Sequence, residues 1–167
     1  MKYSILIFAL LLWSFAITPM AGRCSSHPEA INPCGLIAAE KVMAAFPVLQ
    51  KEERQKVGPI IQCNYLDKFG IPALTVSLGQ AASHARDTLS LLDSGYVIED
   101  VPNLGDEAAV AIQQANPAFG LKEGVAALHI KKGQVSLNLS FTRINIPAKG
   151  AAFDQVKQLA AEMLEKI

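Results

Sequence analysis

Alternating hydrophobic and polar residues predict β-strands in the middle and second half of the chain. Between Val135 and Phe141, the hydrophobic residues alternate strictly with Ser136, Asn138 and Ser140. This pattern is typical of a strand with one buried and one solvated face, as in an antiparallel sheet. The same criterion predicts strands at 61–65 and 74–78. Apolar segments next to turn residues predict two more strands, at 108–112 and 125–130, and 96–98 is a candidate for a short one.

A period of about 3.6 residues predicts three helices. The first begins at Asn32-Pro33, because Asn can cap a helix and Pro fits its first position, and it ends before Pro47. The second covers 81–92, and the third follows Pro147. The hydrophobic stripe of the third helix consists of Phe153, Val156, Ala160, Met163 and Ile167. Between the first helix and the first strand, the polar segment 50–58 predicts a loop or a short helical turn.

The resulting order, helix-β-β-helix-β-β-β-helix, predicts an α+β fold. We expect an antiparallel sheet of about five strands with the helices packed on one face. Residues 32–167 are expected to form this single domain, because a chain of roughly 140 residues can bury one hydrophobic core.

The first 22 residues have the features of a secretory signal peptide. Lys2 precedes an apolar run at 5–17, which as a helix spans about 20 Å, less than the roughly 30 Å of bilayer hydrocarbon. An uncleaved membrane anchor is the alternative. Cleavage after Ala21, Gly22 or Ser26 stays open, and residues 23–31 are expected to form a flexible leader.

The chain contains three cysteines, and an exported protein meets an oxidising environment in which disulfides persist. Cys34 lies at a predicted helix start and Cys63 in a predicted strand, so we predict a disulfide between them in an exported chain. Cys24, in the leader, is then removed, lipidated or free to pair between molecules. The sequence before Cys24 is similar in part to a bacterial lipobox, but Arg23 stands where Gly or Ala is required.

Three short motifs carry a resemblance. Pro33-Cys34-Gly35-Leu36 opens a helix, Cys63 lies in a strand, and Leu104-Gly105-Asp106-Glu107-Ala108 precedes another strand. Over about residues 32–165, this combination resembles a broad set of small exported bacterial proteins and lipoproteins of unknown function. The resemblance implies an envelope domain with one disulfide, in the periplasm or secreted, and it supplies no functional residues.

The balance of acidic and basic residues argues against nucleic acid as a partner. The chain has 15 basic and 15 acidic residues, hence no formal net charge, and 51% of its residues are hydrophobic. Nucleic-acid binding through phosphate neutralisation needs an excess of basic residues, so it is not expected. We expect contact with a membrane only through the signal peptide or a lipid on Cys24.

The sequence contains no recognisable catalytic, metal-binding or cofactor-binding set. His27, His84 and His129 have no metal-ligand spacing, and no nucleophile elbow or phosphate loop is present. His129 is expected on the solvated face of its strand. Asp106 and Glu107 are neighbours that point to opposite faces of an extended chain, which favours a role in a turn. We therefore expect neither enzymatic activity nor a bound metal or cofactor.

Phe119 is the one residue predicted to contact a partner. It lies in the polar loop 113–120, and single aromatic residues in exposed loops often anchor interfaces. The alternative is that Phe119 folds back over the end of the sheet. We expect an exported envelope protein that binds an unknown protein or small ligand without catalysis. A secreted inhibitor of a hydrolase is the alternative function.

Overall fold

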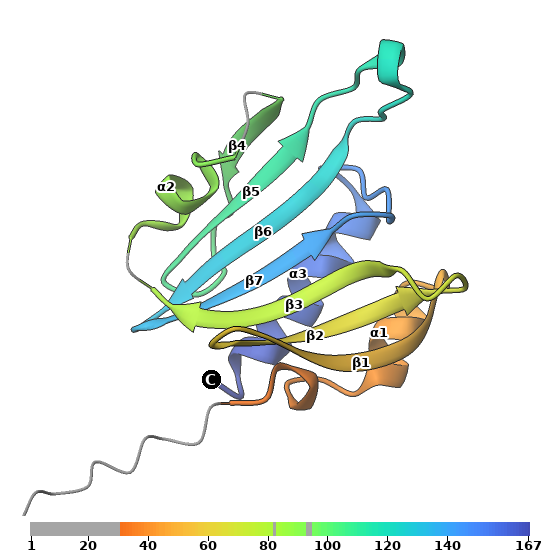
Figure 1. Ribbon diagram of the computed structural model, residues 1–167. Helices are drawn as coiled ribbons and strands as arrows, with labels where there is room; N and C mark the ends of the chain where they lie inside the picture. The colour runs from red at the N-terminus through yellow and green to blue at the C-terminus, as the bar shows by residue number, and fades with distance from the viewer. Residues whose placement is uncertain (1–30, 82, 93–94) are drawn as a thin grey trace, which may run out of the picture. The chain divides into compact units, whose positions relative to one another are not determined.

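A seven-stranded antiparallel sheet organises the described part of the chain, residues 31–81, 83–92 and 95–167 of a computed structural model (Figure 1). The strands are ordered β1-β2-β3-β7-β6-β5-β4, and every neighbouring pair is antiparallel. The strands are β1 (Leu49–Val57), β2 (Ile60–Asp67), β3 (Pro72–Gln80), β4 (Tyr96–Asp100), β5 (Glu107–Gln113), β6 (Gly124–Lys132) and β7 (Val135–Phe141). The helical elements are η1 (Pro33–Gly35), α1 (Ala39–Ala45), α2 (Ala85–Leu89), η2 (Pro117–Phe119) and α3 (Ala151–Leu164). The α+β class is therefore confirmed, but the expected number of strands was too small.

One face of the sheet packs against α1 and α3, which lie behind it in Figure 1. The hydrophobic stripe of α3 is confirmed, with Phe153, Val156, Ala160 and Met163 all buried in the main core. The buried side chains of β7 belong to the same core, so its alternation correctly predicted a strand with one buried face.

The other face of the sheet is covered in part by α2, which corrects the expectation that all helices lie on one face (Figure 1). Ala85 and Leu89 of α2 pack on Ala109 and Ala111 of β5. The interior of β5 is buried on both faces, because its alanines leave room for the helix to approach the strand. Its sequence gives no alternation that would distinguish the two faces.

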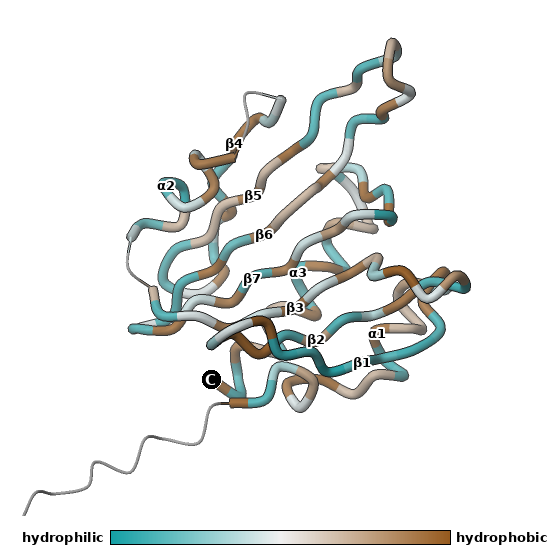
Figure 2. The backbone as a smooth tube through the Cα atoms, in the orientation of Figure 1, coloured by the Kyte–Doolittle hydropathy of each residue, from teal (hydrophilic) through white to brown (hydrophobic). Residues whose placement is uncertain are grey.

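The polar segment after Pro47 is a strand, so the predicted loop at 50–58 is wrong. β1 is an edge strand that pairs only with β2, and most of its side chains are exposed. Figure 2 shows β1 as largely hydrophilic between its ends. An edge strand with polar residues on both faces has no hydrophobic period, and such residues also protect its free edge from pairing with other chains.

Two predicted helices are shorter than expected. The first is divided into η1 and α1, because the chain is extended at Ala38. The second contains only Ala85–Leu89. Leu91 and Leu92, which were predicted to belong to it, are 88% and 42% exposed and therefore add no buried face that would prolong the helix.

His129 lies on the α2 side of β6, opposite Asn138 of β7 and Ala109 of β5. It is only 4% exposed, so the expectation of a solvated histidine was wrong. Its Nδ1 atom is hydrogen-bonded to the Asn138 side-chain oxygen. The Asn138 side chain thus provides a hydrogen-bond partner for the buried His129 ring, on the face of the sheet that α2 partly covers.

The predicted signal peptide at 1–22, Cys24 and nearly all of the predicted leader at 23–31 lie outside the described residues. Within the described ranges, no helix is both long and apolar enough to cross a bilayer.

Candidate functional site

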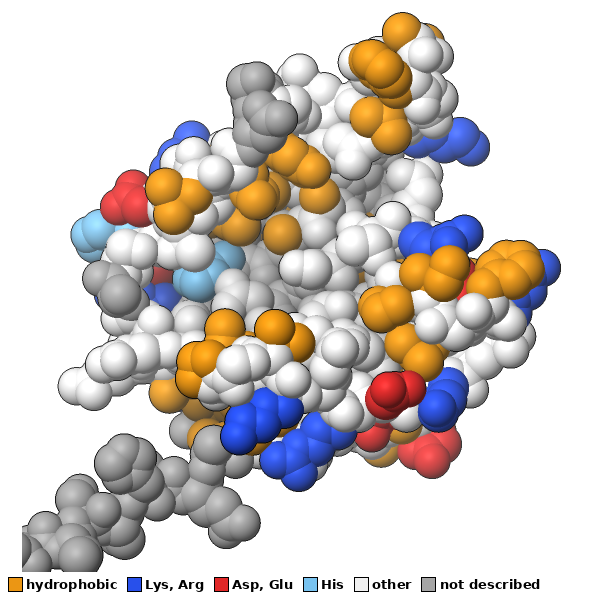
Figure 3. All heavy atoms as spheres, in the orientation of Figure 1, with side chains coloured by type: hydrophobic (Ala, Val, Ile, Leu, Met, Phe, Trp, Pro, Cys, Tyr) orange, Lys and Arg blue, Asp and Glu red, His pale blue; other side chains and the backbone are white. Residues whose placement is uncertain are grey.

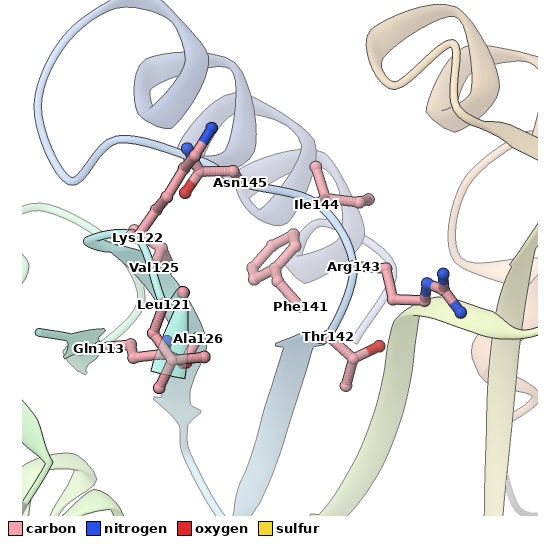
Figure 4. Close-up of a pocket in the computed structure, with 12 residues that line it drawn as sticks. Gln113, Leu121, Lys122, Val125, Ala126, Phe141, Thr142, Arg143, Ile144 and Asn145 are labelled. Atoms are coloured by element: carbon pink, nitrogen blue, oxygen red, sulfur yellow. The ribbon is translucent and has the colours of Figure 1, made fainter. Parts of the chain in front are cut away.

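A pocket opens where β6 and β7 stop pairing. Ala127 and Ser140 are the last paired residues, and the two chains meet again only where the Val125 N–H donates to the Ile146 carbonyl at 2.8 Å. Residues 141–145 do not pair with β6 between these points. The separation leaves a cavity of about 230 Å³, which Figure 4 shows in close-up.

The polar groups around this pocket are neutral or basic. Gln113 and Asn145 contribute amides, Thr142 a hydroxyl, Lys122 an ammonium and Arg143 a guanidinium. In Figure 4, Lys122 and Asn145 lie together at one wall, and Arg143 extends away from them toward β3. None of the described residues that line the pocket is acidic. The arrangement therefore favours an anionic group, such as a carboxylate.

Gly124 shapes the wall that carries Asn145. A Cβ atom at Gly124 would lie 2.6 Å from Asn145 Oδ1 and 3.2 Å from the Ile146 carbonyl oxygen. Only a residue without a side chain lets Asn145 pack this closely against β6.

Arg143 is positioned by Asp67, which lies at the end of β2. Arg143 Nε is 3.3 Å from Asp67 Oδ2, while Asp67 Oδ1 accepts hydrogen bonds from the N–H groups of Phe69 at 2.9 Å and Ile71 at 3.1 Å. Burial alone would raise the pKa of Asp67. The two N–H groups and the positive charges of Arg143 and Lys68 outweigh burial, so the pKa is lowered. An ionised Asp67 thus connects the β2–β3 turn to the pocket.

The β2–β3 turn presents Phe69 beside these charges. Phe69 is 67% exposed, and its ring centroid lies 5.0 Å from Lys68 Nζ and 5.9 Å from Arg143 Cζ. Both distances are within the range of cation–π attraction. Ile71, in the same turn, is also exposed.

The β5–β6 connection presents Phe119 on the other side of the pocket. Asn116 and Leu121 form an isolated bridge with two 3.0 Å hydrogen bonds, and η2 fills the turn between them. Gly120 closes the turn in the left-handed conformation, with φ of 67°. Phe119 is 78% exposed, so the alternative in which it folds back over the sheet is wrong.

The pocket and the two turns form one candidate surface, here called the tip surface. It consists of Phe69, Ile71, Phe119, Leu121, Lys122 and Arg143. Figure 3 shows basic side chains between two groups of hydrophobic side chains along this side of the molecule. Exposed aromatic residues next to charged groups are typical of interface anchors.

The disulfide between Cys34 and Cys63 is present, with a Cα–Cα distance of 5.0 Å. It ties η1 to β2 and is compatible with an oxidising, exported location. These two cysteines and Glu52 of β1 also form a group that could hold a metal ion once the disulfide is reduced.

The motif around Gly105 has a structural role. The Asp106 N–H donates to the Lys131 carbonyl at 2.8 Å, and Asp106 Oδ2 accepts from the Gly133 N–H at 2.6 Å. Asp106 thus holds the loop before β5 against the β6–β7 turn. This agrees with a turn role for Asp106, although the backbone that it binds is distant in sequence.

Glu107 points elsewhere and holds the start of α2. His84 Nδ1 lies 3.0 Å from Glu107 Oε2, and the Ala85 N–H donates to the same oxygen at 3.3 Å. The hydrogen bond from His84 and that from Ala85, together with the charges of His84 and Lys131, outweigh burial and lower the pKa of Glu107. Glu107 and His84 thus fix the start of α2 to β5.

The sequence predicted an exposed loop around Phe119, and the exposure is confirmed, but the sequence did not predict the pocket. Lys122, Arg143 and Asn145 are ordinary surface residues in sequence, and only the separation of β6 from β7 brings them together. The one feature of the sequence that could have indicated the pocket is the pair of polar residues directly after the last hydrophobic residue of β7, Thr142 and Arg143. Comparison of the chain with family models, curated proteins and solved structures finds no match.

Proposed function

We propose that this protein is an exported, non-catalytic binding protein that engages a partner protein through the tip surface. The exposure of Phe119 carries the proposal. A phenylalanine that is 78% exposed on a hydrogen-bonded turn contributes little to folding, whereas aromatic side chains of this kind anchor interfaces.

The pocket supports a protein partner more than a free small ligand. Its volume of about 230 Å³ is below the roughly 300–1,000 Å³ of pockets for drug-sized ligands. A cavity of this size can receive one side chain of a partner. Because Lys122 flanks the cavity and none of its described lining residues is acidic, we expect that side chain to be Asp or Glu.

The absence of catalysis is part of the proposal. No histidine, cysteine or carboxylate is among the described residues that line the pocket. Histidine, cysteine and carboxylates are the most common catalytic groups, and a threonine hydroxyl such as that of Thr142 needs a neighbouring base to become a nucleophile.

The location in the cell envelope, either periplasmic or secreted, is also a proposal. The signal-peptide features at 1–22 and the Cys34–Cys63 disulfide support it. A lipid on Cys24 would add a membrane anchor, and the incomplete lipobox leaves this as the less favoured arrangement.

Inhibition of a hydrolase is the second candidate, and the shape of the β5–β6 turn favours it. The Asn116–Leu121 bridge closes the turn so that Phe119 stands at its end. A preformed turn loses little entropy when it enters an active site. In this case the partner is a hydrolase, and its activity falls when the complex forms.

Site-specific crosslinking tests the proposal. A photoreactive phenylalanine analogue replaces Phe119 in the full chain, which is produced in its own host. The matched control carries the analogue at Leu91, which is 88% exposed and does not belong to the tip surface. We expect one discrete crosslinked protein from position 119 and none from position 91.

Charge reversal then tests the pocket. Lys122→Glu is expected to reduce the crosslink at least tenfold, whereas Lys149→Glu, an exposed lysine outside this pocket, is expected to leave it unchanged. No crosslink at position 119, or equal crosslinks at 119 and 91, would contradict the proposal. If the captured protein is a hydrolase whose activity recovers with Phe119→Ala, inhibition is the function.

A further inference from the structure

Glu52 lies beside the disulfide on the core side of the sheet. It stands directly opposite Tyr65 in the pairing of β1 with β2, and Cys63 is two residues from Tyr65 on the same face. One carboxylate oxygen of Glu52 and the two Sγ atoms of Cys34 and Cys63 all lie within 4.8 Å of one another. Three groups that bind metals well are thus gathered at one place in the core.

Two buried oxygens at this place have no hydrogen-bond partner among the described residues. They are Glu52 Oε2 and the hydroxyl of Tyr65, whose side chain is fully buried. A buried polar atom without a partner is rare and often marks a redox or ion-binding role.

We propose that the reduced chain binds a zinc ion through the thiolates of Cys34 and Cys63 and the carboxylate of Glu52. Water fills the fourth position, because two thiolates and one carboxylate leave one place in a tetrahedral site. The disulfide is the metal-free, oxidised state of the same site. Zinc binding is thereby coupled to the redox state of Cys34 and Cys63.

An external dithiol is the reductant that converts the disulfide into the zinc-binding dithiol. The external dithiol gives two electrons and two protons to the Cys34–Cys63 bond, which breaks to two thiols, while the external dithiol becomes a cyclic disulfide. Zn²⁺ then displaces both thiol protons to solvent as it binds. Reoxidation by a cyclic disulfide reverses the exchange. The cyclic disulfide takes the two electrons from the thiolates and two protons from solvent and becomes a dithiol, while the Cys34–Cys63 bond re-forms and the ion is released.

Electrostatics favours a cation in the reduced state. Cys63 is fully buried and Cys34 and Glu52 are partly buried, so two thiolates beside a carboxylate would repel one another strongly. A divalent ion converts this repulsion into attraction. Thiolate ligands also favour zinc over magnesium or calcium, which prefer oxygen.

Tyr65 completes the arrangement as a positioning residue. Carboxylates that bind zinc are normally hydrogen-bonded by a second residue, which fixes their orientation. The buried hydroxyl of Tyr65 faces Glu52 and has no other partner among the described residues. A small rotation of the carboxylate would let this hydroxyl donate to the oxygen that does not bind the metal.

Titration with Co²⁺ and Zn²⁺ tests the proposal. The full chain, with Cys24→Ser so that only two thiols remain, is reduced with a phosphine that is then removed under anaerobic conditions. We expect one equivalent of Co²⁺ to bind with a thiolate-to-cobalt absorption band, and Zn²⁺ to displace it. The oxidised chain is expected to show no such band.

Glu52→Gln is expected to weaken Zn²⁺ binding by at least about tenfold, and Tyr65→Phe by about tenfold. Glu53→Gln is the matched control, because the next residue of β1 carries the same charge and points to the opposite face. Equal affinities of Glu52→Gln and Glu53→Gln would overturn the proposal, as would a reduced chain that binds no metal.

A further measurement keeps the test decisive if reduction unfolds the chain. Circular dichroism of the reduced chain is recorded with and without one equivalent of Zn²⁺. Because the three proposed ligands come together only in the folded chain, zinc binding is expected to restore the folded spectrum. An unfolded spectrum that zinc does not change would overturn the proposal.

Discussion

Asp67 and Arg143, 76 positions apart in sequence, form an ion pair in which Arg143 Nε is 3.3 Å from Asp67 Oδ2. The Asp67 side chain is 5% exposed and that of Arg143 is 44% exposed. The buried carboxylate also binds the backbone of the β2–β3 turn, so it holds both Phe69 and the arginine that flanks the pocket. Asp67 thus connects the β2–β3 turn of the tip surface to the pocket residue Arg143.

This ion pair predicts that Asp67 stabilises the fold at neutral pH but no longer does so in strong acid. The pKa of folded Asp67 is lowered below the unfolded value of about 3.9, so the ionised group stabilises the fold above that pH. The stabilisation is lost as the pH falls through the folded pKa. Asp67→Asn is therefore expected to lower the urea midpoint at pH 7 and to differ little from the wild type at pH 2.

Asp100→Asn is the control for Asp67→Asn. Asp100 pairs with Arg86 at 3.2 Å, but its side chain is 75% exposed, and exposed ion pairs contribute little. We expect its urea midpoint to follow that of the wild type at every pH. Identical pH profiles for the two variants would show that the Asp67 interactions are not coupled to stability.

A second prediction concerns Gly105, which has φ of 64°. A Cβ atom there would lie 2.6 Å from the Lys131 carbonyl oxygen and 2.7 Å from Ile130 Cγ2. Gly105→Ala is expected to destabilise by about 1–2 kcal/mol for the left-handed backbone, and by about 1–3 kcal/mol more for overpacking. Thermal or urea unfolding measures the sum.

Gly120→Ala separates the two contributions. Gly120 has a similar φ of 67°, but no atom lies within 4 Å of an added Cβ. Only the backbone contribution of about 1–2 kcal/mol is therefore expected at Gly120. Equal losses of unfolding free energy at the two positions would mean that the loop around Gly105 can move away from β6 at no energetic cost.

The disulfide provides a third prediction. It closes a loop with a sequence separation of 29, for which chain entropy predicts a stabilisation of roughly 3.5 kcal/mol. The double variant Cys34→Ala/Cys63→Ala is expected to lose about this free energy of unfolding in urea. Cys24→Ser is expected to lose none. A double variant as stable as the wild type would make the bond dispensable for the fold.

The sequence predicted those elements whose burial differs between their two faces. β7 and α3 each have a buried and an exposed side, and the hydrophobic period reported both correctly. β1 has mostly exposed side chains and no hydrophobic period, so it was predicted as a loop. β5 was predicted as a strand, but because it is buried on both faces its sequence did not show that a helix covers its second face. The sequence predicted the cysteine pair for a different reason, because two ordered cysteines in an exported chain have few alternatives.

The candidate site was predicted only in part, because it depends on tertiary structure. Phe119 could be recognised as an aromatic residue in a polar loop. The pocket exists because β7 separates from β6 after Ser140, and the Arg143 side chain is aimed by Asp67 from another hairpin. Glu52 could not be recognised at all, since its strand was interpreted as a polar loop.

The last prediction contrasts two phenylalanines that a hydrophobic scale treats as equal. Phe141 is 6% exposed and packs edge-on against Phe46 with ring centroids 6.3 Å apart, so Phe141→Ala is expected to lose about 3–5 kcal/mol of stability. Phe119 is 78% exposed, and Phe119→Ala is expected to change stability by less than about 0.5 kcal/mol. Urea unfolding measures both variants under one condition.

The same Phe119→Ala variant should lose the partner that crosslinking captures from the envelope. A side chain that stability does not require, and that binding does, is the signature of an interface anchor. If Phe119→Ala unfolds as easily as Phe141→Ala, the ring supports the fold and the tip surface loses its central residue. If the variant is stable and still binds fully, the partner is held by Lys122 and Arg143 without the aromatic anchor.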